Sequence, residues 1–210
     1  MTNSRKMGSA TSLSARLEAQ GRESGISKND RLESQPIRVA LDAMGGDFGP
    51  QETVKGAMQA LGSDNIQLLL VGDRDTVQAE VDRYDITGKA VSVVPSVDKI
   101  GDNEHPIQAL RSKPKASILE ATKLVKAGDA DVVVSMGSTG ASMASSVFLL
   151  GLMDGLERPA VGGPFLGVAP STVMVDAGSN LDCRPALMLS FAALGSVFAH
   201  RFLEIENPRI

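Results

Sequence analysis

Three loops rich in glycine and aspartate are the feature that most constrains this chain, because each loop directly follows a short apolar segment. They read LDAMGGDFGP at 41–50, SMGSTGAS at 135–142 and VDAGSNLDCRP at 175–185. In a parallel α/β sheet, the turns after the strands collect at one edge, where ligands bind. Glycine lets the backbone approach a ligand closely and adopt positive φ, so its N–H groups can point at an anion. We therefore expect the three loops to converge on a site for a phosphate or an acyl carbonyl.

From residue 37 onward, the chain alternates between strand and helix patterns. Short β-rich or continuously apolar runs predict strands at 37–41, 66–71, 90–94, 131–135 and 172–175. Apolar residues spaced three and four apart predict helices at 51–61, 74–84 and 116–127, a helix that ends at residue 150, and a long helix at 186–203. Gly128 is placed to end the third of these helices. This order predicts an α/β fold with a mainly parallel sheet, right-handed crossovers and helices on both faces.

A connection of about 19 residues, 95–113, follows the third predicted strand and is much longer than usual for this kind of fold. The densest basic cluster of the chain, Arg111, Lys113 and Lys115, lies at its end. These side chains could hold phosphate or an acidic partner, or could simply form a solvated face. His105 has the intrinsic pKa of a general acid or base, although a lone loop histidine is more often structural.

Composition excludes several classes of function. The net charge of -4 argues against a general nucleic-acid surface. A single cysteine excludes an internal disulfide framework, and the two histidines give no metal-ligand spacing, so we expect no metal. No stretch approaches the ~18 apolar residues that a membrane span needs. We expect a cytoplasmic protein whose core, with 3% aromatic residues, is built from small aliphatic side chains.

Residues 1–36 differ from the remainder because they are polar and charged, with few large apolar side chains. The segment has no apolar run typical of a signal peptide, and its acidic residues argue against a plastid transit peptide. We predict a disordered extension with at most a short helix near 14–20, followed by one α/β domain at 37–210.

The first two loops each allow a functional and a structural interpretation. Around Asp42, the spacing matches neither a dinucleotide-binding nor a P-loop motif, so this acid could position a ligand or merely cap the next helix. The second loop, Gly137–Gly140, lies between a strand and a helix, where its N–H groups and the helix dipole favour an anion. The same turn could serve only to pack the helix on the sheet. No GxSxG elbow supports Ser138 as a nucleophile.

The third loop concentrates acids, an amide, a thiol and a guanidinium within ten residues. A site role for Asp176 or Asn180 is one interpretation, whereas Asp182 and Arg184 could simply pair with each other. Cys183 is more often a small buried hydrophobe than a reactive thiol.

Beyond these patterns, the chain resembles a known family. The segments VALDAMGGDFGP, LLLVGD, HPIQALRSKPKASI, VSMGSTGASMASS, ERPAV, VDAGSNLDCRP and FAALGSVFA…ENPR are similar, in order and spacing, to the PlsX family of bacterial phosphate acyltransferases. They cover nearly all of 37–210, and the first and third of these motifs are distinctive of the family, while the others support them. The resemblance implies a three-layer α/β fold related to phosphotransacetylase and isopropylmalate dehydrogenase.

The resemblance also implies a reaction, the transfer of a fatty acyl group from acyl carrier protein to inorganic phosphate for phospholipid synthesis. It implies a homodimer that works near the membrane without a metal or organic cofactor. On this basis we assign catalytic roles, by charge or by orienting the loops, to Asp42, Lys113, Asp176 and Asn180. Binding of phosphate or the carbonyl is assigned to Gly45, Gly46, Asp47, Arg111, Gly137, Ser138, Thr139, Gly140 and Gly178.

The chain departs from the family pattern in three respects. Ser138 and Ser179 stand where the family motifs have an amide and an alanine, and family members continue for well over a hundred residues beyond ENPR. We therefore expect an N-terminal portion of the family's domain. Two alternatives stay open: a phosphotransacetylase-like or dehydrogenase-like enzyme on small substrates, and a non-catalytic remnant that binds acyl carrier protein or a partner chain.

Overall fold

The computed structural model describes residues 35–61, 65–165 and 167–210. The predictions made for the polar extension, including the short helix near 14–20, concern residues that lie almost entirely outside these ranges. Everything below refers to the described residues.

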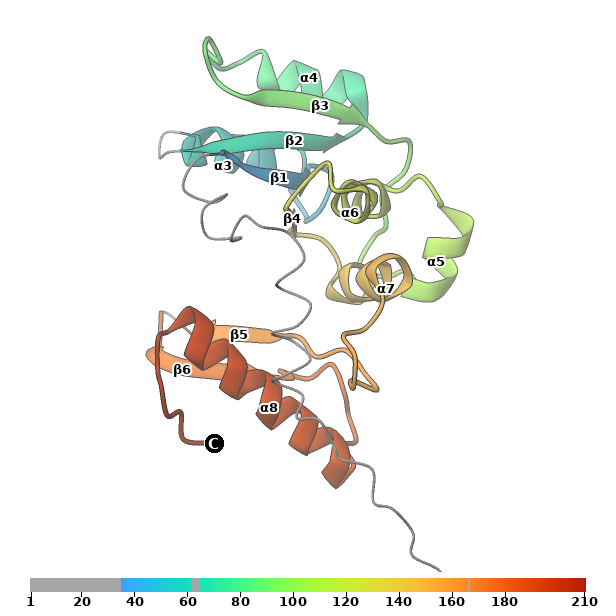
Figure 1. Cartoon of the computed structure of the whole chain (residues 1–210). Helices are drawn as coiled ribbons and strands as arrows, with labels where there is room; N and C mark the ends of the chain where they lie inside the picture. Colours follow the sequence, from blue (N-terminus) through green and yellow to red (C-terminus); the bar gives the residue numbers. More distant parts are fainter. Residues whose placement is uncertain (1–34, 62–64, 166) are drawn as a thin grey trace, which may run out of the picture.

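A four-stranded parallel sheet forms the centre of the domain, in the order β3-β2-β1-β4 (Figure 1). The strands are β1 (Ile37–Asp42), β2 (Ile66–Gly72), β3 (Val91–Pro95) and β4 (Val132–Ser135). Each lies within one residue of its predicted position at either end, so this part of the sequence prediction is confirmed. The register places Asp42 beside Ser135, and the first two glycine loops therefore leave the sheet side by side.

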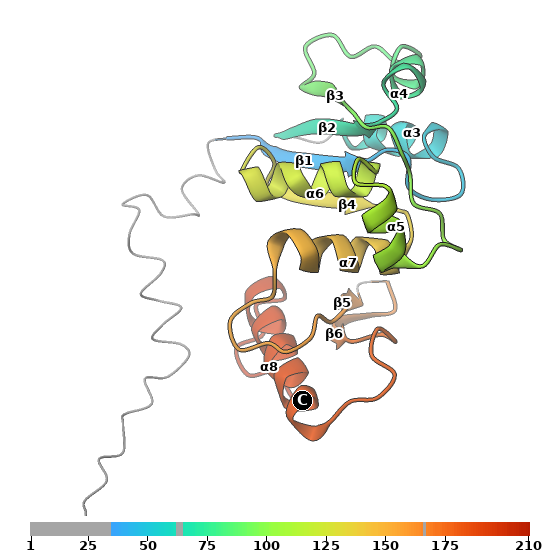
Figure 2. The same ribbon diagram turned by 90° about the vertical axis from the view of Figure 1, so that its right-hand side faces the viewer.

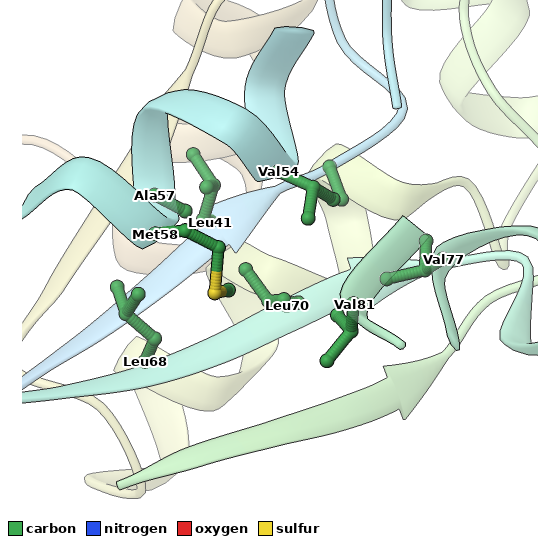
Figure 3. Packing of buried hydrophobic residues seen from close by; sticks show 9 residues of the cluster. Leu41, Val54, Ala57, Met58, Leu68, Leu70, Val77 and Val81 are labelled. Atoms are coloured by element: carbon green, nitrogen blue, oxygen red, sulfur yellow. The ribbon is translucent and has the colours of Figure 1, made fainter. Parts of the chain in front are cut away.

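Helices cover both faces of this sheet, as predicted. On one face lie α3 (Gln51–Ala60) and α4 (Arg74–Val81). Their apolar side chains pack on strand residues that include Leu41, Leu68 and the fully buried Leu70 (Figure 3). Burying a leucine of this kind contributes roughly 1.5–3 kcal/mol. The opposite face is covered by α6 (Ser117–Ala127), which packs on β1, β2 and β4, so the three-layer α/β class is confirmed.

The long connection before α6 is not a continuous loop, because residues 106–112 form α5 (Pro106–Ser112). Pro106 at the first helical position explains why a helix begins there, since proline needs no hydrogen-bond acceptor for its nitrogen. Both α5 and α6 pack against α7 (Thr139–Leu150), which begins at the second glycine loop. The predicted end of α6 at Gly128 is confirmed, since this glycine has the left-handed φ of 80°.

The C-terminal part corrects one prediction. Residues 172–175 form part of a strand, β6 (Ala169–Val175), but that strand does not extend the parallel sheet. It pairs antiparallel with β5 (Gly162–Phe165). The sequence of β5, GGPF, has no strand pattern, so this strand was not predicted. Strands joined by a very short connection can pair only antiparallel, because a parallel pair needs a crossover of a dozen or more residues.

The helix α8 (Pro185–Phe202) packs against this hairpin, mainly on β6. It buries Leu187, Phe191 and Ala199. With 18 residues and a mean hydropathy of 1.2, α8 is long and apolar enough to cross a membrane by length and composition alone. The expectation that no stretch reaches this limit was therefore wrong. Figures 1 and 2 show α7 between the parallel sheet with α6 on one side and the β5–β6 hairpin on the other.

Candidate functional site

The first two glycine loops meet at the adjacent ends of β1 and β4. Asp42 is only 3% exposed, and its Oδ2 accepts a hydrogen bond of 2.7 Å from the Ser135 hydroxyl. The same hydroxyl oxygen accepts the N–H of Gly137 at 3.1 Å. A short chain of hydrogen bonds therefore fixes the second loop relative to the buried acid. Sequence reasoning had not singled out Ser135, although the parallel register with Asp42 could have indicated it.

Glycine is required where the two loops touch. A Cβ at Gly45 would lie 2.8 Å from Asp42 Oδ2, 2.8 Å from the nitrogen of Gly137 and 3.0 Å from Ser135 Oγ. A Cβ at Gly137 would lie 3.3 Å from the Cα of Gly45. These positions serve the packing of loop on loop, and the Gly137 N–H is already used by Ser135.

One oxygen of Asp42 is left without a partner among the described residues. Its Oδ1 is buried and accepts no hydrogen bond there. A buried acceptor in this state costs about 1–3 kcal/mol, so the group is poised to accept a hydrogen bond. Asp42 lines a cavity of about 10 Å³, together with Gly45, Lys99, Ser135 and Ser138.

The N-terminus of α7 opens beside this cavity. Ser138 is the N-cap, and its Oγ accepts the N–H of Ala141 at 3.4 Å. The next two N–H groups, of Thr139 and Gly140, have no acceptor within the described part of the chain. Free N–H groups and the positive end of the helix dipole favour an anion here. Gly140 also lets α7 approach α5, since a Cβ there would lie 2.7 Å from Pro106 Cγ.

The two cationic residues assigned to the site from the sequence, Lys113 and Arg111, lie in different surroundings. Lys113 Nζ binds Glu104 Oε1 at 2.7 Å and the carbonyl of Lys99 at 3.0 Å. Hydrogen bonds from the Gly101 N–H and from Lys113 hold the pKa of Glu104 below its ordinary value, so the pair is charged. Arg111 is exposed and lines a groove between α5, α6 and α7.

The cation that does line the Asp42 cavity is Lys99, which the sequence analysis did not identify. Its side chain is exposed and makes no hydrogen bond or ion pair with the described residues. A single lysine within a long connection carries no signal of its own in the sequence. Only the folding of that connection over the β1–β4 edge brings it to the site.

The remaining first-loop residues face another surface. Gly46 has a φ of 82°, which favours glycine, and it lies against the carbonyl of Met136. Asp47 is exposed and lines a groove on the α3 side of the sheet together with Phe48 and Val134. Asp47 is thus not among the residues that line the Asp42 cavity.

The third loop is organised around Asp176. Its Oδ1 accepts hydrogen bonds from the Ser179 hydroxyl and from both the backbone N–H and the side-chain amide of Asn180, the latter two at 3.1 Å. Burial raises the pKa of Asp176, but the hydrogen bonds from Ser179, Asn180 and Cys183 outweigh it, and the pKa lies below its ordinary value. Asp176 therefore stays ionised and holds its own loop, which turns at Gly178 with a φ of 97°.

This loop contacts the segment 159–161 instead of the first two loops. Asn180 Nδ2 donates to the Pro159 carbonyl at 3.1 Å, and the N–H of Val161 donates to Ser179 Oγ at 3.2 Å. Pro159 and Val161 line one wall of a cleft of about 670 Å³, whose other wall includes Ser135 and Thr139. The expected convergence of three loops thus holds for two of them, while the third shapes the opposite wall.

The contacts of two further residues in the third loop, Cys183 and Arg184, decide between the alternative roles that the sequence left open. Burial, with the nearby Asp176 carboxylate, raises the pKa of the Cys183 thiol, which therefore stays protonated and is a poor nucleophile. Arg184 pairs with Glu157 at 2.5 Å and not with Asp182, the partner that the sequence suggested.

No group of three or more His, Cys, Asp or Glu side chains in the described ranges could hold a metal ion. His105 lies at the N-cap of α5, and its side chain makes no capping hydrogen bond.

Comparison with known proteins identifies the family to which this chain belongs. A family model described as a fatty acid synthesis protein matches residues 37–210. A phosphate acyltransferase from Desulforamulus reducens is 45% identical over 174 residues, which is 83% of this chain and 52% of that protein. Those of Pelotomaculum thermopropionicum and Thermosynechococcus vestitus are 41% and 43% identical, over 83% and 82% of this chain and 51% of each relative. The chain spans about half the length of the curated relatives it matches. It therefore belongs to the phosphate acyltransferase family that its loop motifs indicated, the family whose model is described as fatty acid synthesis.

Proposed function

We propose that this chain acts in the transfer of an acyl group from a thioester to inorganic phosphate, giving an acyl phosphate. The observation that carries the proposal is the pair of N–H groups at the start of α7 that find no acceptor among the described residues, beside the buried Asp42 and the exposed Lys99. Membership of the phosphate acyltransferase family supports the same reaction.

The reaction mainly requires that phosphate be positioned against the thioester carbonyl and that the developing negative charge be stabilised. An oxygen of hydrogenphosphate attacks the thioester carbon and forms a C–O bond, and a tetrahedral oxyanion develops. Collapse of this intermediate breaks the C–S bond, and the thiolate leaves with the electron pair. The proton of hydrogenphosphate passes to the thiol, so atoms and charge balance. Because phosphate is already anionic at neutral pH, holding it against the carbonyl accounts for much of the expected rate gain.

We assign the roles from the geometry of the described residues. The N–H groups of Thr139 and Gly140 bind phosphate or the oxyanion, and a single good donor of this kind is worth about 2.7–4 kcal/mol in the transition state. Lys99 adds positive charge. Asp42 acts as a positioning residue, because it holds Ser135 and, through it, the turn at Gly137.

The acyl donor, partners and cellular role are also proposals. We infer an acyl carrier protein as donor, a homodimer as the working form, a cytoplasmic location, and an acyl phosphate product used in phospholipid synthesis. An acidic carrier would dock through the basic cluster of Arg111, Lys113 and Lys115, since the rest of the chain is net acidic. This cluster lies at and just beyond the end of α5.

The test is phosphate-dependent release of free thiol from palmitoyl-acyl carrier protein by the purified chain. We expect turnover above background, and we expect Lys99→Ala to raise the phosphate KM about ten- to a hundredfold, the loss of one charge-assisted contact. Lys126→Ala is the matched control, because this exposed lysine lies in the last turn of α6, outside the cavity.

Three results would count against the proposal in different ways. A folded chain that binds the carrier but releases no thiol would support the non-catalytic alternative. Turnover of small coenzyme A thioesters without the carrier would support a phosphotransacetylase-like enzyme. An unchanged phosphate KM in Lys99→Ala would remove that lysine from the site.

A further inference from the structure

Lys99 lies in a stretch of chain whose course is held by neighbouring elements. Asp98 forms a parallel bridge with Ala116, and the carbonyl of Asp98 accepts the N–H of Ser117 at 2.9 Å. Ile100, on the other side of Lys99, is only 9% exposed and packs in a cluster of apolar residues from α5, α6 and α7. The residues before and after Lys99 are therefore anchored, while the Lys99 side chain itself is exposed at the Asp42 cavity.

An ion pair fixes the two peptide groups on either side of Ile100. Lys113 Nζ donates to the carbonyl of Lys99 at 3.0 Å and to Glu104 Oε1 at 2.7 Å. The same oxygen of Glu104 accepts the N–H of Gly101 at 2.7 Å. The carbonyl before Ile100 and the N–H after it are thus joined through two side chains, which sets the direction in which the Lys99 side chain leaves the backbone.

The ion pair itself lies outside the candidate site. Among the described residues, those that line the Asp42 cavity and the cleft of about 670 Å³ include neither Glu104 nor Lys113. The two side chains are 36% and 31% exposed, and an ion pair with this exposure contributes little to stability. Its contacts therefore point to the backbone around Lys99 as the place where the pair has an effect.

A fixed backbone matters for a lysine because its side chain is long and flexible. Holding the ammonium group beside an anion costs rotamer entropy, and an exposed lysine has many other positions available. A backbone that already directs the side chain toward the site lowers this cost, since fewer degrees of freedom have to be fixed on binding.

We propose that Glu104 and Lys113 are positioning residues for phosphate binding, which together hold the backbone of Lys99 so that its ammonium group lies beside the anion site at the start of α7. This inference rests on the proposed function, because it takes Lys99 as a source of charge for phosphate. Neither Glu104 nor Lys113 touches the reacting atoms in this role.

The substitution Glu104→Ala tests the proposal because charge and positioning have opposite effects on phosphate. Removing a carboxylate from the neighbourhood of an anion site favours the anion by simple electrostatics. Loss of positioning weakens binding instead. We expect the phosphate KM in the thiol-release assay to rise about three- to thirtyfold, as is typical of coupled neighbouring residues, with kcat nearly unchanged.

Asp102→Ala is the matched control. Asp102 lies in the same connection, is exposed, and makes no hydrogen bond or ion pair with the described residues. The variant removes the same charge without touching the Glu104–Lys113 pair, so its phosphate KM should stay unchanged or fall slightly.

Two further variants distinguish positioning from a general effect on the fold. Glu104→Gln keeps a side-chain oxygen that can accept hydrogen bonds from Gly101 and Lys113, so its phosphate KM should lie close to that of the unmodified chain. Glu104→Ala in a Lys99→Ala background should raise the KM no further than Lys99→Ala alone, because no ammonium group remains to be positioned.

Several outcomes would overturn the proposal. They are a phosphate KM that falls or stays unchanged in Glu104→Ala, an equal rise in Glu104→Gln, and effects of Glu104→Ala and Lys99→Ala that multiply in the double variant. Urea unfolding checks that each variant is folded, and we expect midpoints near that of the unmodified chain. If Glu104→Ala does not fold, Lys113→Ala removes the same contacts, and its double variant with Lys99→Ala makes the same decision.

Calorimetric titration with inorganic phosphate separates this inference from the proposed function. Suppose that the chain releases no thiol, but that its phosphate Kd rises in Glu104→Ala and not in Asp102→Ala. The proposed transfer then fails while the positioning role holds. Thiol release with an unaltered phosphate KM in Glu104→Ala would give the reverse result. An unmodified chain that binds no phosphate would overturn both.

Discussion

At the scale of single residues, the site depends on how closely two backbones approach. A Cβ at Gly45 would lie 2.8 Å from both the nitrogen of Gly137 and Oδ2 of Asp42, so the backbone here leaves no room for a side chain. The acid, the Ser135 hydroxyl and the Gly137 N–H then form one hydrogen-bonded unit. The glycine content of the loops is thus explained by loop packing as much as by ligand binding.

The substitution Gly45→Ala tests this packing. We expect it to destabilise the fold by roughly 1–3 kcal/mol, typical of overpacking, and to lower thiol release at least tenfold. Urea unfolding and the transfer assay measure the two effects.

Gly56→Ala is the control for that experiment. A Cβ at Gly56, inside α3, meets nothing within 4 Å, so the change should stabilise the helix by about 0.5–1 kcal/mol and leave transfer unchanged. Equal behaviour of the two variants would show that the close contact at Gly45 does not matter.

At the scale of elements, an ion pair joins β1 to the start of β4 at the edge opposite the site. Arg38 binds the Asp131 carboxylate through its guanidinium at 2.8 and 3.1 Å and through its backbone N–H at 2.9 Å. These hydrogen bonds and the guanidinium charge lower the pKa of Asp131 from 3.8 to about 2. The pair therefore helps to align two strands that are far apart in sequence.

This pKa predicts a pH dependence of stability. Since the pKa of Asp131 is lower in the folded than in the unfolded chain, its contribution is complete above pH 4 and is lost as the pH falls toward 2. We expect Asp131→Asn to lower the free energy of unfolding at pH 5 but to have little effect near pH 2. The loss should be small and should shrink with salt, because both side chains are about 40% exposed.

Urea titrations at several pH values measure this dependence. The exposed Asp154, which makes no ion pair or hydrogen bond with the described residues, provides the matched variant Asp154→Asn, which should be neutral at every pH. A pH-independent loss in Asp131→Asn would mean that ionisation of the carboxyl is not what stabilises the strand pair.

At the scale of the whole molecule, one edge of the parallel sheet is open. β4 pairs only with β1 among the described strands. Val132 and Val134 are each 39% exposed along it, and Met136 and Phe48 continue the apolar surface around a groove of about 600 Å³. An unpaired, apolar strand edge is a surface that associates with another polypeptide.

We therefore expect the chain to self-associate through this edge, which would also fit the proposed homodimer. Val134→Lys should shift sedimentation velocity profiles toward monomer at micromolar concentration, because an edge lysine opposes strand pairing. Val168→Lys is the control, since Val168 is 79% exposed in the hairpin connection, away from β4. Association that persists unchanged in Val134→Lys would place the contact elsewhere.

The sequence by itself determined the local elements of this protein and the positions of its loops. The spacing of apolar residues and the glycines or prolines at the ends of elements are local signals. They sufficed to predict β1 to β4 and the helices α3, α6 and α7. Family motifs likewise identified the family, because they depend on residue order alone.

Only the tertiary structure decided which distant groups meet. It paired β6 with β5, placed Lys99 at the Asp42 cavity, joined Arg184 to Glu157 and set the third loop across a cleft from the second. Each of these depends on contacts between segments that are separate in the chain, where several partners satisfy the same residue. The choice among them is made by packing and burial of the whole domain, which no local pattern encodes.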